Sequence, residues 1–210
     1  MKRLVLAITL VCCSLGLAAQ EDSFRVNFKG SKPTITDFAW AFLFSDQSDE
    51  EECGHEAVAG IEDALKRYRA GKKQSKGVTF IVDERNGYIL YEHRYEGGGH
   101  KQEMCFWNES DGKHKLFAFN NMTSFDEQPP VLTESSGIIF CRYNNATKKM
   151  TYCIPSIIDV EYPNTSYELP RIGKDIILTR WNDDGTKKEQ EVLKWNGHGF
   201  SQNHVHLLEQ

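Results

Sequence analysis

Apolar runs between Val78 and Phe119 are separated by short polar segments that contain glycine, a pattern that predicts antiparallel strands joined by tight turns. Val78 to Val82 is apolar and rich in β-branched residues, which favour strands. Three further segments continue the pattern: Tyr88 to Tyr95, Glu103 to Trp107 and Lys115 to Phe119. The sequence therefore predicts a meander of three or four strands as the centre of the fold.

Glycine-containing segments separate these strands. Asn86-Gly87 supplies the pair of positive-φ residues that a hairpin turn requires. Gly97-Gly98-Gly99 is predicted to close the second strand, and Asn108 to Gly112 to form the next turn. Such short breaks are typical of hairpins rather than of crossover connections.

Two segments before the meander have helical features. Residues 38–44 are apolar throughout and follow Thr36, a candidate N-cap, so we expect a helix there, although the alternating aromatic residues also suit a buried strand. From about Glu50 to Ala70, apolar residues recur at a spacing of three to four and form one face. Gly71 is expected to end this helix.

The remaining segments predict a shorter list of elements. Phe24 to Phe28 has a β-like pattern. A hairpin is suggested by Gly137 to Tyr143 and Met150 to Ile154. The last strands are expected at Asp175 to Arg180 and at Glu189 to Trp195, and a turn follows before Phe200. Asn120 to Thr133 and residues 155–170 contain several prolines and are interpreted as loops. We therefore expect one α+β domain over residues 21–210. In it, one or two N-terminal helices pack on a twisted, mostly antiparallel sheet of about six to eight strands.

The first twenty residues have the pattern of a secretory signal peptide. Lys2 and Arg3 precede an uncharged, mostly apolar run from Leu4 to Leu17, and Ala18-Ala19 provides the small residues of a cleavage site. Cys12-Cys13 suggests a lipoprotein signal as an alternative, but no small residue stands before Cys12. We expect a secreted or periplasmic protein, and no later segment approaches the ~20 apolar residues that a membrane span needs.

The charge balance disfavours two classes of partner. The chain has 25 basic and 30 acidic side chains, a net charge of −5, and loss of Lys2 and Arg3 with the leader makes it −7. Nucleic acids and anionic membranes both attract basic surfaces, so we expect neither as a partner. The basic clusters along the sequence are Lys66 to Lys76, at the predicted end of a helix, and Lys187-Lys188.

Four cysteines remain after removal of the leader, an even number that is consistent with two disulfides in an exported chain. If the predicted hairpin is centred on Thr147, Cys141 lies opposite Cys153 at a distance that suits a disulfide. Cys53 and Cys105 would then form the second bond. Four buried thiols are the alternative.

Three tryptophan-asparagine pairs each end a predicted strand. Trp107, Trp181 and Trp195 could cover the edge of the core, or they could form a row of exposed rings that stack on sugars. We keep them as candidate ligand-binding residues.

The sequence lacks the strong catalytic motifs: a nucleophile elbow, a phosphate-binding loop, His-Glu-x-x-His or Cys-x-x-Cys. Cys53, His55, His204 and His206 are the best metal ligands, but residues two apart on a helix diverge, so we expect neither a metal nor a cofactor.

Cys105 could act as a nucleophile only if His93 or His100 lies beside it. Four glycosylation sequons, at Asn108, Asn121, Asn145 and Asn164, are all expected in loops.

Several short motifs in a fixed order are similar to those of a group of small exported proteins of Bacteroidetes to which no activity is assigned. The motifs are Ile35-Thr-Asp-Phe38, Asn86-Gly-Tyr-Ile89, Glu103-Met-Cys-Phe-Trp-Asn108 with Asp111-Gly112, Leu169-Pro-Arg-Ile-Gly-Lys174 and Leu193-Lys-Trp-Asn-Gly197. The resemblance implies a Gram-negative envelope or secreted location and supplies no catalytic residues.

These observations favour a non-enzymatic binding or accessory module of the cell envelope. Its ligand would be a small molecule, a glycan or an envelope protein. The alternatives are a hydrolase whose site is assembled from residues distant in the sequence, and a structural protein of an envelope assembly.

Overall fold

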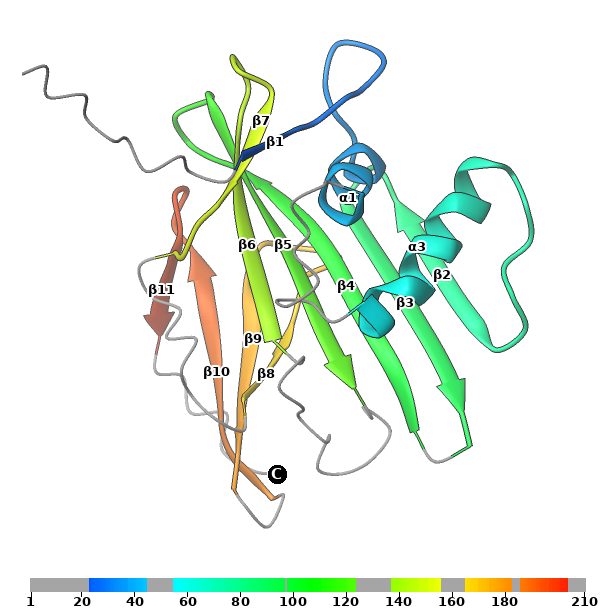
Figure 1. Ribbon diagram of the computed structural model, residues 1–210. Coiled ribbons are helices and arrows are strands. Elements are labelled where there is room, and N and C mark those ends of the chain that lie inside the picture. Colours follow the sequence, from blue (N-terminus) through cyan, green and yellow to red (C-terminus); the bar gives the residue numbers. More distant parts are fainter. Residues whose placement is uncertain are drawn as a thin grey trace, which may run out of the picture.

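The computed structural model describes residues 23–44, 55–96, 98–123, 137–155, 165–182 and 186–203, and these form two helices and two antiparallel sheets (Figure 1). The helices are α1 (Ile35–Leu43) and α3 (His55–Arg69). The strands are β1 (Ser23–Arg25), β2 (Val78–Asp83), β3 (Tyr88–Tyr95), β4 (Gly98–Asn108), β5 (His114–Thr123), β6 (Gly137–Asn144), β7 (Lys149–Tyr152), β8 (Thr165–Glu168), β9 (Ile176–Trp181), β10 (Lys187–Trp195) and β11 (Phe200–Asn203).

The larger sheet has seven strands in the order β1-β7-β6-β5-β4-β3-β2. Strands β2 to β7 follow one another as a meander, and β1 returns to pair with β7 at the far edge. The smaller sheet is a second meander of four strands, in the order β11-β10-β9-β8. This arrangement confirms the predicted α+β class with a mostly antiparallel sheet, and it adds a second sheet that the sequence did not separate from the first.

The helices cover one face of the large sheet (Figure 1). Every second residue of the central strands points to this side, so that Phe117 and Phe119 of β5 meet Phe42 of α1 at ring-centroid distances of 5.4 and 5.1 Å. Phe38 packs against Phe117 in the same layer and is fully buried. The apolar run at 38–44 is therefore helical up to Leu43, as predicted, and most of it is buried against the sheet.

The smaller sheet covers the opposite face. The alternate residues of β5, Leu116 and Ala118, join a second core that contains Leu178 of β9, Leu193 of β10 and Phe200 of β11. The central strands are thus buried on both sides. This explains their continuous apolar composition better than a sheet with one solvent-exposed face would.

Hydrogen bonds at the helix ends join α1 to the sheet. The N-cap is Thr34 rather than the predicted Thr36, and its backbone N–H donates to Asp37 Oδ2 at 2.9 Å. The Thr36 hydroxyl instead donates to Glu84 Oε1 at 2.8 Å, and the Ile35 N–H donates to Glu84 Oε2 at 3.1 Å. A carboxylate from the β2–β3 turn therefore sits at the positive end of α1.

Helix α3 ends as predicted at Gly71. Gly71 has a φ of 64°, and its N–H donates to the Tyr68 carbonyl, while the Lys72 N–H donates to the Arg67 carbonyl. This pair of bonds is the Schellman arrangement, in which a left-handed glycine satisfies the last carbonyls of a helix. The predicted beginning of this helix, at residues 50–54, lies outside the described residues.

Several turn and loop predictions are wrong. Gly87 has a positive φ but Asn86 does not, because the β2–β3 connection is a four-residue turn rather than a two-residue one. Gly98 and Gly99 are the first residues of β4 and pair with Tyr95 and Arg94.

Two predicted loops also contain strands. Residues 120–123 continue β5, and residues 165–168 form β8, an edge strand of the second sheet whose four residues are too few for a clear pattern.

Candidate functional site

Three turns and one N-terminal segment meet at one end of the large sheet, which we call the hairpin-turn end. The turns are residues 109–113 between β4 and β5, 145–148 between β6 and β7, and 196–199 between β10 and β11, and the segment is residues 26–34. Backbone bonds join them: the Val26 N–H donates to the Lys148 carbonyl at 2.9 Å and the Ser110 N–H to the Gly197 carbonyl at 2.8 Å.

A pocket of about 490 Å³ opens at the hairpin-turn end, on the helix-covered side of the sheet. Its wall includes the rings of Phe28 and Tyr143 and three lysines from separate elements: Lys32 in the N-terminal segment, Lys115 on β5, and Lys148 in the β6–β7 turn. A pocket of this size is large enough for a small polar ligand. A second hollow of about 350 Å³ lies along the β6–β7 hairpin and shares His114 with the first.

The lysines of this pocket have aromatic and amide neighbours. Lys148 Nζ lies 5.1 Å from the Phe28 ring centroid, and Lys115 Nζ lies 4.9 Å from that of Phe106 and donates to Asn108 Oδ1. Within the described ranges, none of the three ammonium groups forms an ion pair with a carboxylate. Burial, and next the positive charge of Lys32, lower the pKa of Lys115 below its usual value.

Lys148 has an unusual backbone conformation. Its φ is 58°, and it is the only non-glycine residue with a positive φ in the part of the chain that the structure describes. Asn144 stabilises the turn that leads to Lys148, because Asn144 Oδ1 accepts hydrogen bonds from the N–H groups of Ala146 (2.9 Å) and Thr147 (3.1 Å). A lysine therefore occupies a position that glycine or asparagine usually takes.

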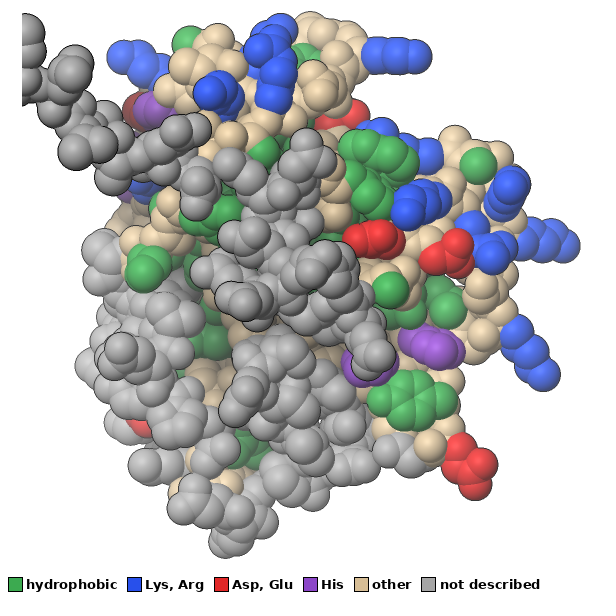
Figure 2. Space-filling model, viewed as in Figure 1, with side chains coloured by type: hydrophobic (Ala, Val, Ile, Leu, Met, Phe, Trp, Pro, Cys, Tyr) green, Lys and Arg blue, Asp and Glu red, His purple; other side chains and the backbone are tan. Residues whose placement is uncertain are grey.

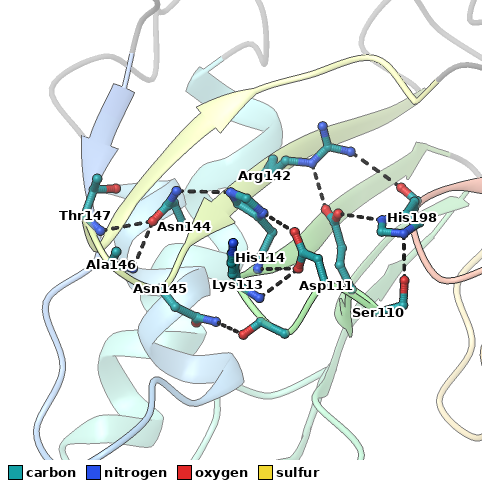
Figure 3. Close-up of polar contacts among 12 residues, drawn as sticks. Ser110, Asp111, Lys113, His114, Arg142, Asn144, Asn145, Ala146, Thr147 and His198 are labelled. Atoms are coloured by element: carbon teal, nitrogen blue, oxygen red, sulfur yellow. Dashed lines mark hydrogen bonds and ion pairs between the residues drawn. The ribbon is translucent and has the colours of Figure 1, made fainter.

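A polar network lies at the same end, on the side of the second sheet (Figure 3). Glu109 is only 4 % exposed, and its Oε1 accepts a hydrogen bond from Arg142 Nε at 2.7 Å. Glu109 Oε2 lies 3.4 Å from His198 Nδ1, and the other ring nitrogen of His198 lies 2.7 Å from Ser110 Oγ. Serine, histidine and carboxylate thus follow one another as nucleophile, base and orienting group do in acyl-transfer enzymes.

Asp111 and His114 form a second part of this network (Figure 3). Asp111 Oδ2 lies 2.6 Å from His114 Nδ1, and this hydrogen bond is the main reason that the pKa of Asp111 lies well below its usual value. Glu109, Asp111 and His114 each offer a ligand atom, all within 4.8 Å of one another. The Arg142 guanidinium beside Glu109 would repel a cation, so we interpret the group as a hydrogen-bond network.

The three candidate tryptophans do not form one exposed row. Trp107 is 4 % exposed, stacks on Trp195 at a centroid distance of 5.7 Å, and donates its indole N–H to the Lys174 carbonyl. Of the two alternatives for Trp107, the core position is confirmed and the exposed ring is wrong, because the second sheet covers it. Trp195 is half-buried against the same core, and half-buried Trp181 donates its indole N–H to Ser166 Oγ at 2.9 Å.

The predicted hairpin register around the cysteines is wrong by one residue. Cys141 lies opposite Tyr152 rather than Cys153, since the β6–β7 turn has four residues. Cys141 packs in the core under the helices while Cys153 packs on the second-sheet side, and no disulfide joins Cys105, Cys141 and Cys153 to one another. Cys53, the predicted partner of Cys105, lies outside the described residues.

Cys105 is not placed for nucleophilic catalysis. His100 lies on β4, five residues before Cys105, which corresponds to about 17 Å at the usual rise of a strand. His93 of β3 pairs with His100 and is therefore also distant from Cys105. Burial, and next the charge of Glu103, raise the pKa of Cys105 well above its usual value. The proposed contact with either histidine is therefore wrong.

Other candidate residues have mixed outcomes. Cys53, His204, His206 and Asn164 lie outside the described residues, as does the side chain of His55. Of the remaining sequons, Asn145 is in an exposed turn and Asn108 is the exposed last residue of β4. Asn121 is buried within β5, so its loop prediction is wrong.

Sequence reasoning missed the lysines of the pocket and the contact between Ser110 and His198. Lys32, Lys115 and Lys148 are separated by whole strands, and no pattern along the chain connects them. The available signal is that Lys115 and Lys148 stand next to or in a predicted turn, and turns at one end of a meander lie close together.

No family model, curated protein or solved structure matches this chain. Among the described residues, neither helix is long and apolar enough to cross a membrane.

Proposed function

We propose that this protein is an exported, non-enzymatic binding module that holds a small polar ligand, free or as part of a glycan, at the hairpin-turn end. The observation that carries the proposal is the pocket of about 490 Å³, whose wall combines aromatic and charged side chains from several segments of the chain. Pockets with a partly apolar wall and a few converging polar groups are the usual form of a ligand site. The signal peptide pattern supports export, and the resemblance to exported Bacteroidetes proteins supports a location in a Gram-negative envelope.

A thermal-shift screen tests this function. The probes are a panel of neutral and acidic mono- and disaccharides together with common metabolites, added to the processed protein. Ser31→Trp places a large side chain in the pocket wall, while Ser75→Trp places the same residue on an exposed loop elsewhere. We expect at least one probe to raise the Tm of the wild type and of Ser75→Trp, but not of Ser31→Trp. No shift with any probe, or an equal shift in both variants, would contradict the proposal.

The contact of Ser110 with His198 favours a second candidate function, hydrolysis by acyl transfer. Ser110 Oγ is within hydrogen-bond reach of a histidine whose other nitrogen faces the buried carboxylate of Glu109. The test is labelling with a fluorophosphonate probe, followed by peptide mapping. Labelling of Ser110 that disappears in His198→Gln would support the hydrolase, and an unlabelled Ser110 in folded protein would exclude it.

A further inference from the structure

Positive charge gathers at the hairpin-turn end although the chain as a whole is acidic. Figure 2 shows several Lys and Arg side chains at the top of the view, where the β6–β7 hairpin and the N-terminal segment lie in Figure 1. Three of the lysines, Lys32, Lys115 and Lys148, line the same pocket. Acidic side chains elsewhere in the sequence outnumber the basic ones and give the whole chain its net charge of −5.

Among the described residues, Glu109 is the carboxylate of the pocket wall, and it does not compensate these charges. Glu109 accepts a hydrogen bond from Arg142 at 2.7 Å, so its negative charge is already paired with a guanidinium. Lys115 is half-buried beside Lys32, and its lowered pKa reflects the cost of holding this charge there. An anion placed between the two ammonium groups would remove that cost.

The backbone of Lys148 is an independent observation. A lysine at a φ of 58° is less stable than a glycine would be, and such residues cluster at binding and catalytic sites. Lys148 lies over the ring of Phe28 and lines the same pocket as Lys115. A glycine would remove the strain but also the third ammonium group.

We infer that the hairpin-turn pocket binds an oxyanion, a sulfate, phosphate or carboxylate group, which Lys32, Lys115 and Lys148 hold together. This inference rests on the proposed function and adds the chemical class of its ligand. The ammonium groups would hold the charge, and the ring of Phe28 would contact the less polar part of a molecule that carries it.

Isothermal titration calorimetry with sodium sulfate tests the inference, with sodium chloride at matched ionic strength as the reference. Lys115→Gln and Lys148→Gln each remove one pocket charge, and Lys113→Gln removes an exposed charge from the adjacent β4–β5 turn. We expect sulfate to bind the wild type, about fivefold weaker binding for each pocket variant, and less than twofold weaker binding for Lys113→Gln. Equal weakening in all three variants would overturn the inference, because it would indicate only a general charge effect.

A second arm distinguishes a free ion from a group on a larger ligand. The same disaccharide is titrated in sulfated and unsulfated forms. Tighter binding of the sulfated form than of inorganic sulfate identifies a carried group, whereas equal affinity identifies the ion itself, and both support the oxyanion. If the unsulfated form binds equally well and Ser31→Trp abolishes this binding, the oxyanion is wrong while the binding function stands. If no probe binds, both are wrong.

Discussion

The two faces of the large sheet are buried by different means. Under the helices the core is built from rings, with Phe38 of α1 packed between Phe106, Phe117 and Tyr143 at centroid distances of 5.0 to 6.2 Å. Under the second sheet the core also contains the carboxylate of Glu103, a residue only 3 % exposed. The first face also buries the hydrogen-bonded amides of Gln102 and Asn121, 2.9 Å apart, but the second buries a carboxylate among several donors.

Hydrogen bonds surround the Glu103 carboxylate. It accepts from the Tyr88 hydroxyl at 2.7 Å, from Asn120 Nδ2 at 3.1 Å and from the Leu169 N–H at 3.3 Å, and Lys101 Nζ lies 3.3 Å away. Asn120 donates its second amide hydrogen to the Tyr167 carbonyl of β8 at 2.7 Å. Because apolar side chains slide past one another more easily than hydrogen-bonded groups do, this cluster specifies where the second sheet lies on the first.

The same division extends to the hairpin-turn end. The pocket with its lysines lies on the helix-covered side, next to Phe28 and Tyr143 of that core. The contact between Ser110 and His198 belongs to the other side, because the β10–β11 turn of the second sheet carries His198. Glu109 borders both, but the lysines and His198 belong to different layers, so substitutions of the lysines and of His198 can separate the two candidate functions.

The largest effect should come from the ring core. Phe38→Ala removes a fully buried ring from the contact of α1 with the sheet, so we expect the free energy of unfolding to fall by about 4 kcal/mol. Phe38→Leu, which keeps most of the volume, should cost about 1 kcal/mol. Urea denaturation followed by tryptophan fluorescence measures both. A loss below 1 kcal/mol for Phe38→Ala would show that α1 contributes little to stability.

A smaller and more local effect is expected at Glu103. Glu103→Leu leaves the Tyr88 hydroxyl, the Asn120 amide and the Leu169 N–H without their acceptor, and should cost about 3 kcal/mol. Hydrogen exchange should accelerate in β8 before it does in β3. Adding Tyr88→Phe removes one of the stranded donors, and so the cost of Glu103→Leu should shrink in that background. Equal costs in the two backgrounds would argue against the network.

The sequence predicted the helix-covered face far better than the other. The apolar stripe of α3, its end at Gly71 and the meander of strands from β2 to β5, although not the details of its turns, follow from local patterns, because each depends on neighbours within one turn or one strand. Trp107 illustrates what local patterns miss. It alternates with Phe106 and so must point away from the helices, and only the second sheet, formed much later in the chain, makes that side a core.

The candidate site was harder to predict because it depends on the β6–β7 turn, whose left-handed residue is a lysine and not a glycine. Asn144 caps the β6–β7 turn and Lys148 adopts the left-handed conformation, so the turn contains four residues instead of five. A turn of five residues would have put Cys153 opposite Cys141 on the same face of the sheet. With four residues, Cys153 lies on the other face. The four-residue turn also brings Lys148 to the pocket, which no spacing along the sequence indicates.

Lys148 provides a test at the helix-covered side in which stability and binding change in opposite directions. Lys148→Gly should raise the free energy of unfolding by about 0.5 kcal/mol, because relief of the left-handed strain exceeds the added flexibility of the unfolded chain. The same substitution should weaken sulfate binding as Lys148→Gln does. Calorimetric titration and urea denaturation measure the two quantities. A less stable Lys148→Gly variant would mean that contact with Phe28 outweighs the strain.

The smallest effect concerns the turn that both sides share. The pKa of Asp111 is lowered in the folded state, first by the hydrogen bond to His114 and then by the Lys113 N–H. A carboxyl group whose folded pKa lies below the value of 3.8 expected for the unfolded chain stabilises the fold when it is ionised. This contribution is complete above about pH 5 and is lost as the pH falls through 3.8 toward the folded pKa.

The stability difference between wild type and Asp111→Asn should therefore be larger at pH 5 than at pH 3 and should decline below about pH 4. Urea denaturation at several pH values measures it, and subtraction of the variant removes the titration of carboxylates that both proteins share. In a His114→Gln background the main hydrogen bond is absent, so the difference should be smaller throughout. A difference that stays constant down to pH 2 would mean that Asp111 acts through its backbone contacts in the turn and not through its charge.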